Sequence, residues 1–192
     1  DMPPMAGFFI GPWSFQRGVQ ATDRVIQYGD MIHGDLCGAS FMGYNTCYYR
    51  TFIVGRKPTA KEKDWYQRVL NKQNAIIETI KPGVTTADLA KHMTPAEEWG
   101  YPSERYGFSL DICHGIGLGR HEPPVATRVW SLKHPEVIEA GMTIAVETID
   151  GEPRVGGVRI EDQVVVTETG AEIIGRFPRD ELLVCSPINV GF

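Results

Sequence analysis

The chain has 192 residues, which is long enough for one domain with a buried core and short for two. Apolar residues make up 42% of it and charged residues 22%, a composition typical of globular rather than disordered proteins. With 19 Lys and Arg against 24 Asp and Glu, the net charge of -5 argues against a general nucleic-acid-binding protein, and no apolar run approaches the ~18 residues of a membrane helix.

The first quarter of the chain is predicted to form strands and turns. Glycines and prolines interrupt residues 1–30, which is typical of short strands joined by turns. Residues 31–54 are rich in β-branched and aromatic side chains, with Gly38 and Gly43 as expected turns or bulges.

Two helices are predicted next. Apolar residues recur at helical spacing over residues 59–80, and Pro82 and Gly83 end this helix. A second helix is expected from Thr85 or Thr86 to about Trp99, with a break or kink at Pro95.

The second half of the chain is predicted to consist mainly of strands. They are expected within residues 111–118, 142–149, 155–166 and 172–174. The predicted fold class is α+β, with one large, mostly antiparallel sheet and two central helices on one face.

Three short segments contain residues suited to catalysis or metal binding. In the first, glycines separate His114 from His121; glycine lets the backbone approach a ligand, and imidazole is both a metal ligand and a base near neutral pH. Glu147 and Glu161 lie in the other two, inside β-rich sequence, where a buried carboxylate is costly unless it is paired or binds a metal. A turn with two surface histidines and strand carboxylates facing solvent are the structural alternatives. Together the residues favour one convergent site.

Five segments occur in a characteristic order. They are Tyr49-Arg-Thr-Phe-Ile-Val-Gly55, Ile80-Lys-Pro-Gly-Val84, His114-Gly-Ile-Gly-Leu-Gly-Arg-His121-Glu-Pro-Pro, Gly141-Met-Thr-Ile-Ala-Val-Glu147 and Gly156-Gly-Val-Arg-Ile-Glu-Asp162. These segments resemble the pita-bread family of creatinase, methionine aminopeptidase, aminopeptidase P and prolidase, and most closely its Xaa-Pro peptidase branch. The resemblance implies a pita-bread fold, with mostly antiparallel sheet inside and helices outside.

The resemblance also implies roles for individual residues. Metal-dependent relatives hold two divalent ions with two Asp, one His and two Glu, and the last three match His114, Glu147 and Glu161. His121 matches a histidine that contacts substrate and stabilises the tetrahedral intermediate. Arg159 matches an arginine that supports the second Glu.

The two Asp positions of the family differ in this chain. They fall on Leu36 and Cys47, so a site for two Mn²⁺ or Co²⁺ ions lacks hard oxygen ligands. Candidate additional ligands are Asp35 through a one-residue bulge, His33 on the same strand face, and Cys47 as a thiolate that favours Zn²⁺. One metal held by the remaining His and two Glu is a further arrangement. Trp13 is expected to line the substrate pocket, with core packing as the alternative.

Three functional hypotheses remain open. The first, which we favour, is a hydrolase of the Xaa-Pro dipeptidase or aminopeptidase P type, in which a metal-activated water attacks the bond next to proline. The second is a metal-independent, creatinase-like hydrolase, with His114 as proton shuttle and Glu147 and Glu161 holding a small cationic substrate. The third is a non-catalytic protein that uses the fold to bind peptides or partners.

Cofactor, partner and location follow as expectations. A divalent metal (Mn, Co or Zn) is expected, or none if the protein is creatinase-like, together with a small peptide or small-molecule substrate, a homodimer, and no nucleic-acid or membrane partner. The cysteines lack close pairing, and no signal peptide is recognisable, which favours the reducing cytoplasm. Residues 1–192 are expected to be the C-terminal catalytic pita-bread domain, without the N-terminal part of that domain and any preceding domain.

Overall fold

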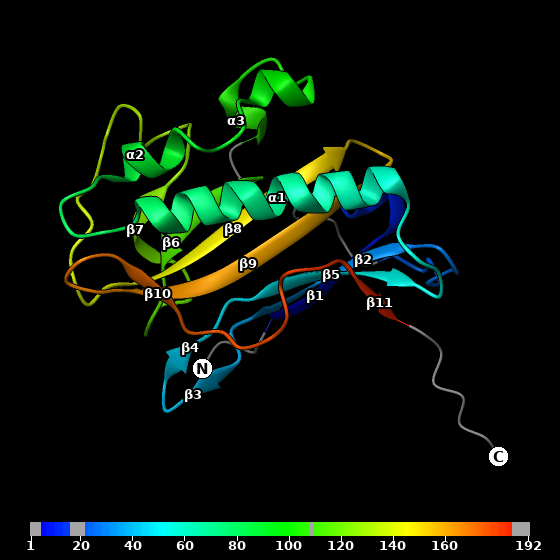
Figure 1. Ribbon diagram of the computed structural model, residues 1–192, viewed down its shortest axis with the longest axis horizontal. Coiled ribbons are helices and arrows are strands. Elements are labelled where there is room, and N and C mark those ends of the chain that lie inside the picture. The colour runs from blue at the N-terminus through cyan, green and yellow to red at the C-terminus, as the bar shows by residue number, and fades with distance from the viewer. Residues whose placement is uncertain (1–4, 16–21, 108–109, 186–192) are drawn as a thin grey trace.

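Two β-sheets and one long helix make up most of the computed structural model, which describes residues 5–15, 22–107 and 110–185 (Figure 1). The larger sheet has five strands in the order β10-β9-β8-β6-β7, and every neighbouring pair is antiparallel. Its strands are β6 (Ile112–Gly115), β7 (Glu122–Ala126), β8 (Thr143–Glu152), β9 (Gly156–Val166) and β10 (Ala171–Ile173).

The smaller sheet has the strand order β1-β2-β5-β11, and β11 runs parallel to β5. Its strands are β1 (Met5–Ile10), β2 (Met31–Cys37), β5 (Tyr49–Val54) and β11 (Leu183–Cys185). Between β2 and β5 the chain forms a hairpin, β3 (Ser40–Phe41) and β4 (Tyr44–Asn45), whose turn includes Gly43 with a φ of 87°. The prediction of one large sheet was wrong, because β2 and β5 pair with each other and with β1 and β11 rather than with the larger sheet.

Helix α1 (Ala60–Thr79) covers the outer face of β8 and β9 (Figure 1). The Thr59 hydroxyl accepts the Glu62 N–H, and the Glu62 carboxylate accepts the Thr59 N–H, so both free donors at the helix start are satisfied. Trp65 and Val69 pack from its buried face onto strand β9. The helix predicted over residues 59–80 is confirmed.

The other helical segments are short. They are η1 (Gly11–Trp13), α2 (Thr86–Ala90), η2 (Ala96–Trp99) and α3 (Glu104–Gly107). The second helix starts at its N-cap Thr85 and is interrupted before Trp99, as predicted, but the break comes early, because α2 ends at Ala90 and helical structure resumes only after Pro95 in η2. The Thr94 N–H donates to the Asp111 carboxylate at 3.0 Å instead of a helical carbonyl, and a residue before proline disfavours helical geometry.

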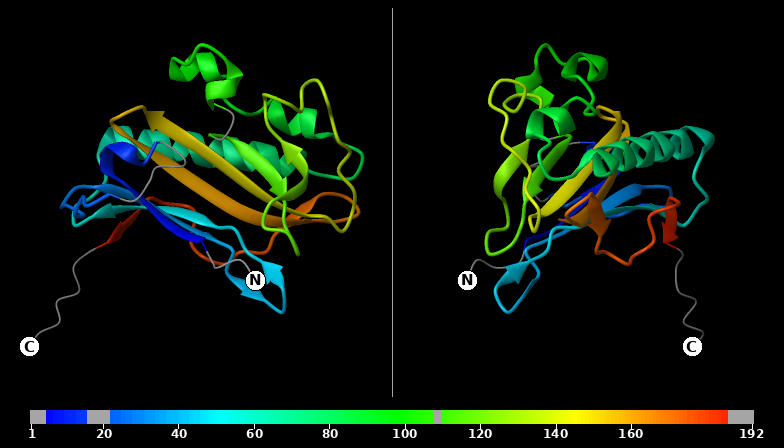
Figure 2. Two further views of the ribbon diagram at one scale, coloured as in Figure 1. Left: turned by 180° about the vertical axis from the view of Figure 1, so that it is seen from behind. Right: turned by 60° about the vertical axis from the view of Figure 1, so that its left-hand side comes forward.

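Alternation along β8 and β9 separates an outer face from an inner face. Val146 and Ile160 lie on the outer face, in the clusters that α1 completes. Ala145 lies on the inner face and packs against Tyr49 of β5. Figure 2 shows the smaller sheet on this side of the long strands and α1 on the other. Polar side chains on the inner face are therefore enclosed between the two sheets. No described helix is long and apolar enough to cross a membrane.

Candidate functional site between the two sheets

Two carboxylates and an imidazole meet on the inner face of the larger sheet. Glu147 of β8 lies directly opposite Glu161 of β9. His114 of β6 lies opposite Ala145, two residues before Glu147. Residues two apart on a strand share a face, so the three side chains point to the same side, and all three are fully buried. The structure thus brings together the three metal ligands implied by the resemblance.

The ring nitrogens of His114 face different groups. Nδ1 lies 2.9 Å from the Gly115 carbonyl oxygen, which only accepts, so this contact places the hydrogen on Nδ1. Nε2 lies 3.6 Å from Glu161 Oε1. Burial acts to lower the pKa of His114, but Glu161 and Glu147 outweigh it, so the pKa is raised from its ordinary value. Nε2 is consequently the atom that can bind a metal or a proton.

Arg159 holds Glu147, the first of the two Glu, whereas the resemblance implies support of the second, Glu161. Its Nη1 donates to Glu147 Oε2 at 2.9 Å, and its Nη2 donates to the Leu110 carbonyl oxygen at 3.1 Å. Both members of the ion pair are fully buried, and the guanidinium lies 5.3 Å from the centre of the Tyr49 ring. With Glu161 included, two buried carboxylates face one guanidinium. With both carboxylates ionised and His114 neutral, these three groups carry one excess negative formal charge, which suits a proton or a cation.

His33 and Asp35, the other candidate ligands, make contacts within the smaller sheet. The Tyr49 hydroxyl donates to one Asp35 carboxylate oxygen at 2.6 Å, and the Cys37 N–H donates to the other at 2.9 Å. The His33 ring stacks on Phe9 with centroids 4.5 Å apart. Among the described residues, neither belongs to a group with metal-binding geometry. The other family Asp position, Leu36, is 51% exposed on the opposite face.

Cys47, at the remaining family Asp position, forms a disulfide with Cys37. The two Cα atoms are 4.0 Å apart, and both side chains are buried with Tyr49, Ile116 and Ala145. The wide spacing of the cysteines in the sequence does not predict this pair; it forms because the β3–β4 hairpin folds the two residues against each other. A disulfide sulfur is no thiolate, so the expected thiolate ligand is absent in this state of the described chain.

In the part of the chain that the structure describes, three groups of His, Cys and Glu side chains have their ligand atoms within 4.8 Å of one another. They are Cys37, Cys47 and His121; Cys47, His114 and Glu161; and His114, His121 and Glu147. The overlapping groups define one region, centred on His114, rather than separate sites. Each group combines nitrogen with sulfur or oxygen, a donor mixture suited to zinc and similar divalent ions.

The loop between β6 and β7 brings His121 to the site. Its ring centroid is 4.2 Å from that of His114. The Gly119 N–H donates to the Glu122 carboxylate at 2.7 Å, and a Cβ at residue 119 would lie 2.6 Å from that carboxylate. The Asn45 side chain, on the hairpin, donates to the Leu118 carbonyl oxygen at 2.8 Å. Glycine is required at residue 115, where the loop leaves β6, because a Cβ there would lie 2.4 Å from the Pro123 backbone carbonyl oxygen.

A cavity of about 920 Å³ opens beside this loop. Its lining comes from the β3–β4 hairpin, the glycine loop and the start of β8, and includes Phe41, Tyr44, Gly117, Glu122 and Met142. Substrate sites are commonly apolar cavities of this size, and this one reaches Gly115, next to His114, although none of His114, His121, Glu147 and Glu161 lines it. Trp13, in η1, does not line this cavity, and its role in a substrate pocket stays a prediction.

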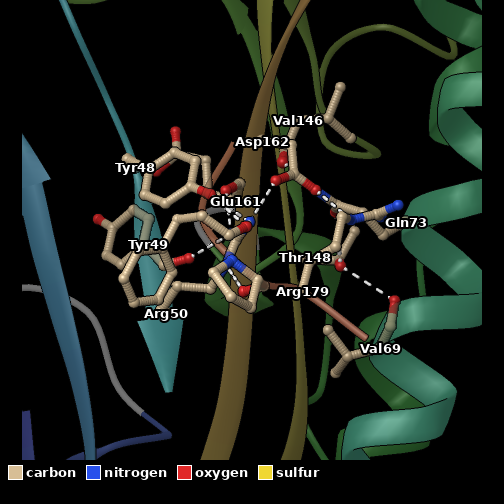
Figure 3. Close-up of polar contacts among 12 residues, drawn as sticks. Tyr48, Tyr49, Arg50, Val69, Gln73, Val146, Thr148, Glu161, Asp162 and Arg179 are labelled. Atoms are coloured by element: carbon tan, nitrogen blue, oxygen red, sulfur yellow. Dashed lines mark hydrogen bonds and ion pairs between the residues drawn. The ribbon is translucent and has the colours of Figure 1, made fainter. Parts of the chain in front are cut away.

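Behind Glu161, an ion-pair network anchors β9 (Figure 3). Asp162 is fully buried on the outer face, 2.7 Å from Arg50 Nη2 and 2.8 Å from Arg179 Nε. Arg50 Nη1 also donates to the Glu161 carbonyl oxygen at 2.6 Å. Sequence reasoning assigned no role to Asp162 or Arg50, although both lie in the quoted segments. Two opposite charges, each inside a β-rich apolar segment, were the available indication of a buried ion pair.

Comparison with known sequences agrees with this geometry. A profile of the family described as "Metallopeptidase family M24" matches residues 14–168. The chain is 36% identical over 163 residues to an Xaa-Pro dipeptidase of Pyrococcus horikoshii, covering 83% of this chain and 43% of that protein. It is 36% identical over 165 residues to the Xaa-Pro dipeptidase of Pyrococcus furiosus, covering 84% and 44%. The chain thus spans less than half the length of these curated relatives.

Solved structures show the same fold. An Xaa-Pro dipeptidase from Bacillus anthracis superimposes with a TM-score of 0.77 at 33% identity, covering 94% of this chain and 48% of that one. Dipeptidase PepE from Mycobacterium ulcerans gives a TM-score of 0.77 at 30% identity, covering 93% and 46%. The predicted pita-bread fold and Xaa-Pro peptidase branch are confirmed. Because the family profile matches most of this chain, the chain belongs to metallopeptidase family M24.

Proposed function

We propose that this chain carries the catalytic site of a metal-dependent peptidase that cleaves small peptides next to proline. The observation that carries the proposal is the convergence of buried His114, Glu147 and Glu161 on one face between the two sheets. The family match and the Xaa-Pro dipeptidase relatives support the reaction class. A cytoplasmic location and a homodimer remain predictions.

The donor set fits one divalent ion better than two. Two ions need four carboxylates for charge balance in the metal-dependent relatives, and the two Asp positions here hold an exposed leucine and a disulfide-bonded cysteine. Asp35 is already engaged by Tyr49 and a backbone N–H. His114, Glu147 and Glu161 would hold a single ion in the three-ligand manner of catalytic zinc. Mn, Co and Zn are the candidates.

The chemistry divides between the ion and this chain's own residues. When bound, the ion lowers the pKa of a water ligand and polarises the substrate carbonyl. Arg159 fixes the orientation of Glu147, and the network of Arg50 and Asp162 fixes β9 behind Glu161. In this proposal His121, whose ring lies 4.2 Å from that of His114, would donate a hydrogen bond to the substrate oxygen that gains charge.

The creatinase-like alternative has less support in the geometry. It requires both carboxylates to hold a substrate cation, whereas Arg159 already donates to Glu147. Hydrolysis of a panel of Xaa-Pro dipeptides and of creatine-like compounds, with and without added Zn²⁺, Mn²⁺ or Co²⁺, tests the proposal. We expect metal-dependent cleavage of the dipeptides that is abolished in Glu161→Gln and retained in a surface control such as Glu172→Gln. Turnover of creatine-like compounds without metal, or no turnover of either class, would contradict the proposal.

A further inference from the structure

The Cys37–Cys47 disulfide lies at the candidate metal site itself. Although Cys47 is bonded to Cys37, its sulfur and one ligand atom each of His114 and Glu161 lie within 4.8 Å of one another. Ligand atoms around tetrahedral zinc are roughly 3.5 Å apart, given its bond lengths of about 2.0–2.3 Å. Shifts of about 1 Å in side-chain position would therefore bring these three atoms to bonding distance of one ion.

The oxidation state of the sulfur decides whether it can bind. A thiolate is a strong, soft ligand for Zn²⁺, whereas a disulfide sulfur carries no charge. Two buried carboxylates and one guanidinium already give the cluster a negative charge, and a thiolate would add a second. A divalent cation would compensate both charges. Cys47 is therefore expected to favour metal binding as a thiolate and not as a disulfide.

We propose that Cys37 and Cys47 are a redox-controlled switch of the metal site, in which reduction frees Cys47 to bind one zinc-type ion together with His114 and Glu161. This inference rests on the proposed function, which locates the metal site. It adds a thiolate ligand and regulation by oxidation, neither of which the proposed function requires. Cys37 is the resolving cysteine, which removes the ligand by forming the disulfide. Its own sulfur is not part of the His114 and Glu161 group.

The chemical steps balance with a phosphine as the reductant. The phosphine takes the oxygen of a water molecule and becomes a phosphine oxide, the S–S bond breaks, and the two hydrogens of the water end on the sulfurs of Cys37 and Cys47. When the ion binds, the Cys47 S–H bond breaks, a sulfur–metal bond forms, and the proton leaves to solvent. Reoxidation by a disulfide reagent would release the ion and restore the Cys37–Cys47 bond.

Cys113 provides a matched control inside the same sheet. It neighbours His114 in β6 but packs in the outer cluster with Ile76 and Val146, on the α1 side. Its thiol therefore points away from the ligand atoms, although it is just as buried as Cys47. Cys113→Ala removes one thiol next to the site without touching the proposed ligand set.

Cobalt binding gives a readout that is independent of activity. The protein is reduced with a phosphine, desalted without oxygen and titrated with Co²⁺ alone, in parallel with disulfide-bonded protein. The reduced form should show a thiolate-to-cobalt charge-transfer band that saturates at about one ion per chain, and the oxidised form should lack it. Because loss of an outer-shell partner already weakens metal binding by 10–100-fold, loss of this ligand should raise the Kd at least as much. An equal band or an equal Kd in both states would overturn the switch.

Variants separate the two cysteines. Cys47→Ser should lose the band in both states, Cys37→Ser should keep it in both because no disulfide can form, and Cys113→Ala should behave as wild type. A band that persists in Cys47→Ser, or disappears in a folded Cys37→Ser, would refute the assignment. Circular dichroism checks folding. If Cys47→Ser does not fold, Cys37→Ser still tests the switch, because its cobalt band should be the same before and after oxidation.

The two proposals can fail separately. If the band behaves as expected but no dipeptide is cleaved, the proposed function fails and the switch stands. If dipeptides are cleaved equally before and after oxidation and no thiolate band forms, the switch fails and the proposed function stands.

Discussion

Replacing Arg159 with methionine tests whether the buried guanidinium holds the site together. Methionine fills part of the same space but leaves Glu147 facing Glu161 without the cation that now lies 2.9 Å from it. Both partners of the pair are fully buried, and breaking a buried ion pair from one side costs about 3–5 kcal/mol. A chain of this length loses about 2–4 °C of Tm per kcal/mol, so the Tm should fall by roughly 6–20 °C.

Urea unfolding followed by circular dichroism measures the change in free energy of unfolding directly. Arg68→Met is the matched control, because Arg68 is half-exposed and its ion pairs with Asp64 and Asp150 lie at the surface. We expect this control to lose less than about 1 kcal/mol. Adding Glu147→Gln to Arg159→Met should restore part of the loss, since it removes the buried charge. Equal losses for Arg159→Met and Arg68→Met would refute the electrostatic account of the site.

Three further predictions concern the loop, the free thiols and the anchor of β9. Gly119→Ala should lower kcat/KM for dipeptides about tenfold with little change in Tm, because its Cβ would displace the Glu122 carboxylate that accepts the Gly119 N–H in the loop that carries His121; unchanged kinetics would exclude that role. Iodoacetamide at pH 8 should alkylate exposed Cys185 and spare Cys113 in the folded protein, since burial raises the pKa of the Cys113 thiol well above its ordinary value, and mass spectrometry after digestion reads this out. Asp162→Asn should destabilise the protein by about 2–4 kcal/mol in urea unfolding, because two buried arginine contacts lose their counter-charge, and a loss below about 1 kcal/mol would contradict the network.

Local patterns predicted the parts of the fold whose causes lie within a few residues. The apolar spacing over residues 59–80 and the stop at Pro82 and Gly83 place α1 almost to the residue. Gly38 and Gly43 both adopt positive φ, as turns between the strands of residues 31–54 require. These features depend on backbone geometry and side-chain periodicity, which a single segment already contains.

Features that depend on distant partners could not be predicted in this way. The second helix ends early because the Thr94 N–H bonds to Asp111, a residue that lies next to a later strand. The division into two sheets depends on which strands pair, and the β-rich composition of residues 31–54 is compatible with either arrangement.

The same distinction applies to the candidate site. His114, Glu147 and Glu161 were predicted as one cluster through an ordered set of segments, and the strand register brings them together. The Cys37–Cys47 disulfide and the hydrogen bond from the Tyr49 hydroxyl to Asp35 were not predicted, because each depends on how β2 and β5 pair. A change of one residue in that register would exchange the inward and outward side chains.

Metal stoichiometry tests the central claim most directly. Reduced protein is equilibrated with Zn²⁺, freed of excess ion by gel filtration, and analysed by elemental mass spectrometry together with Glu161→Gln and the surface control Glu172→Gln. Because the structure brings together one His and two Glu of the five ligands that the family resemblance implies, we predict about one ion per chain in the wild type and in Glu172→Gln, and much less in Glu161→Gln. Two ions per chain, or one ion that Glu161→Gln retains, would contradict the account.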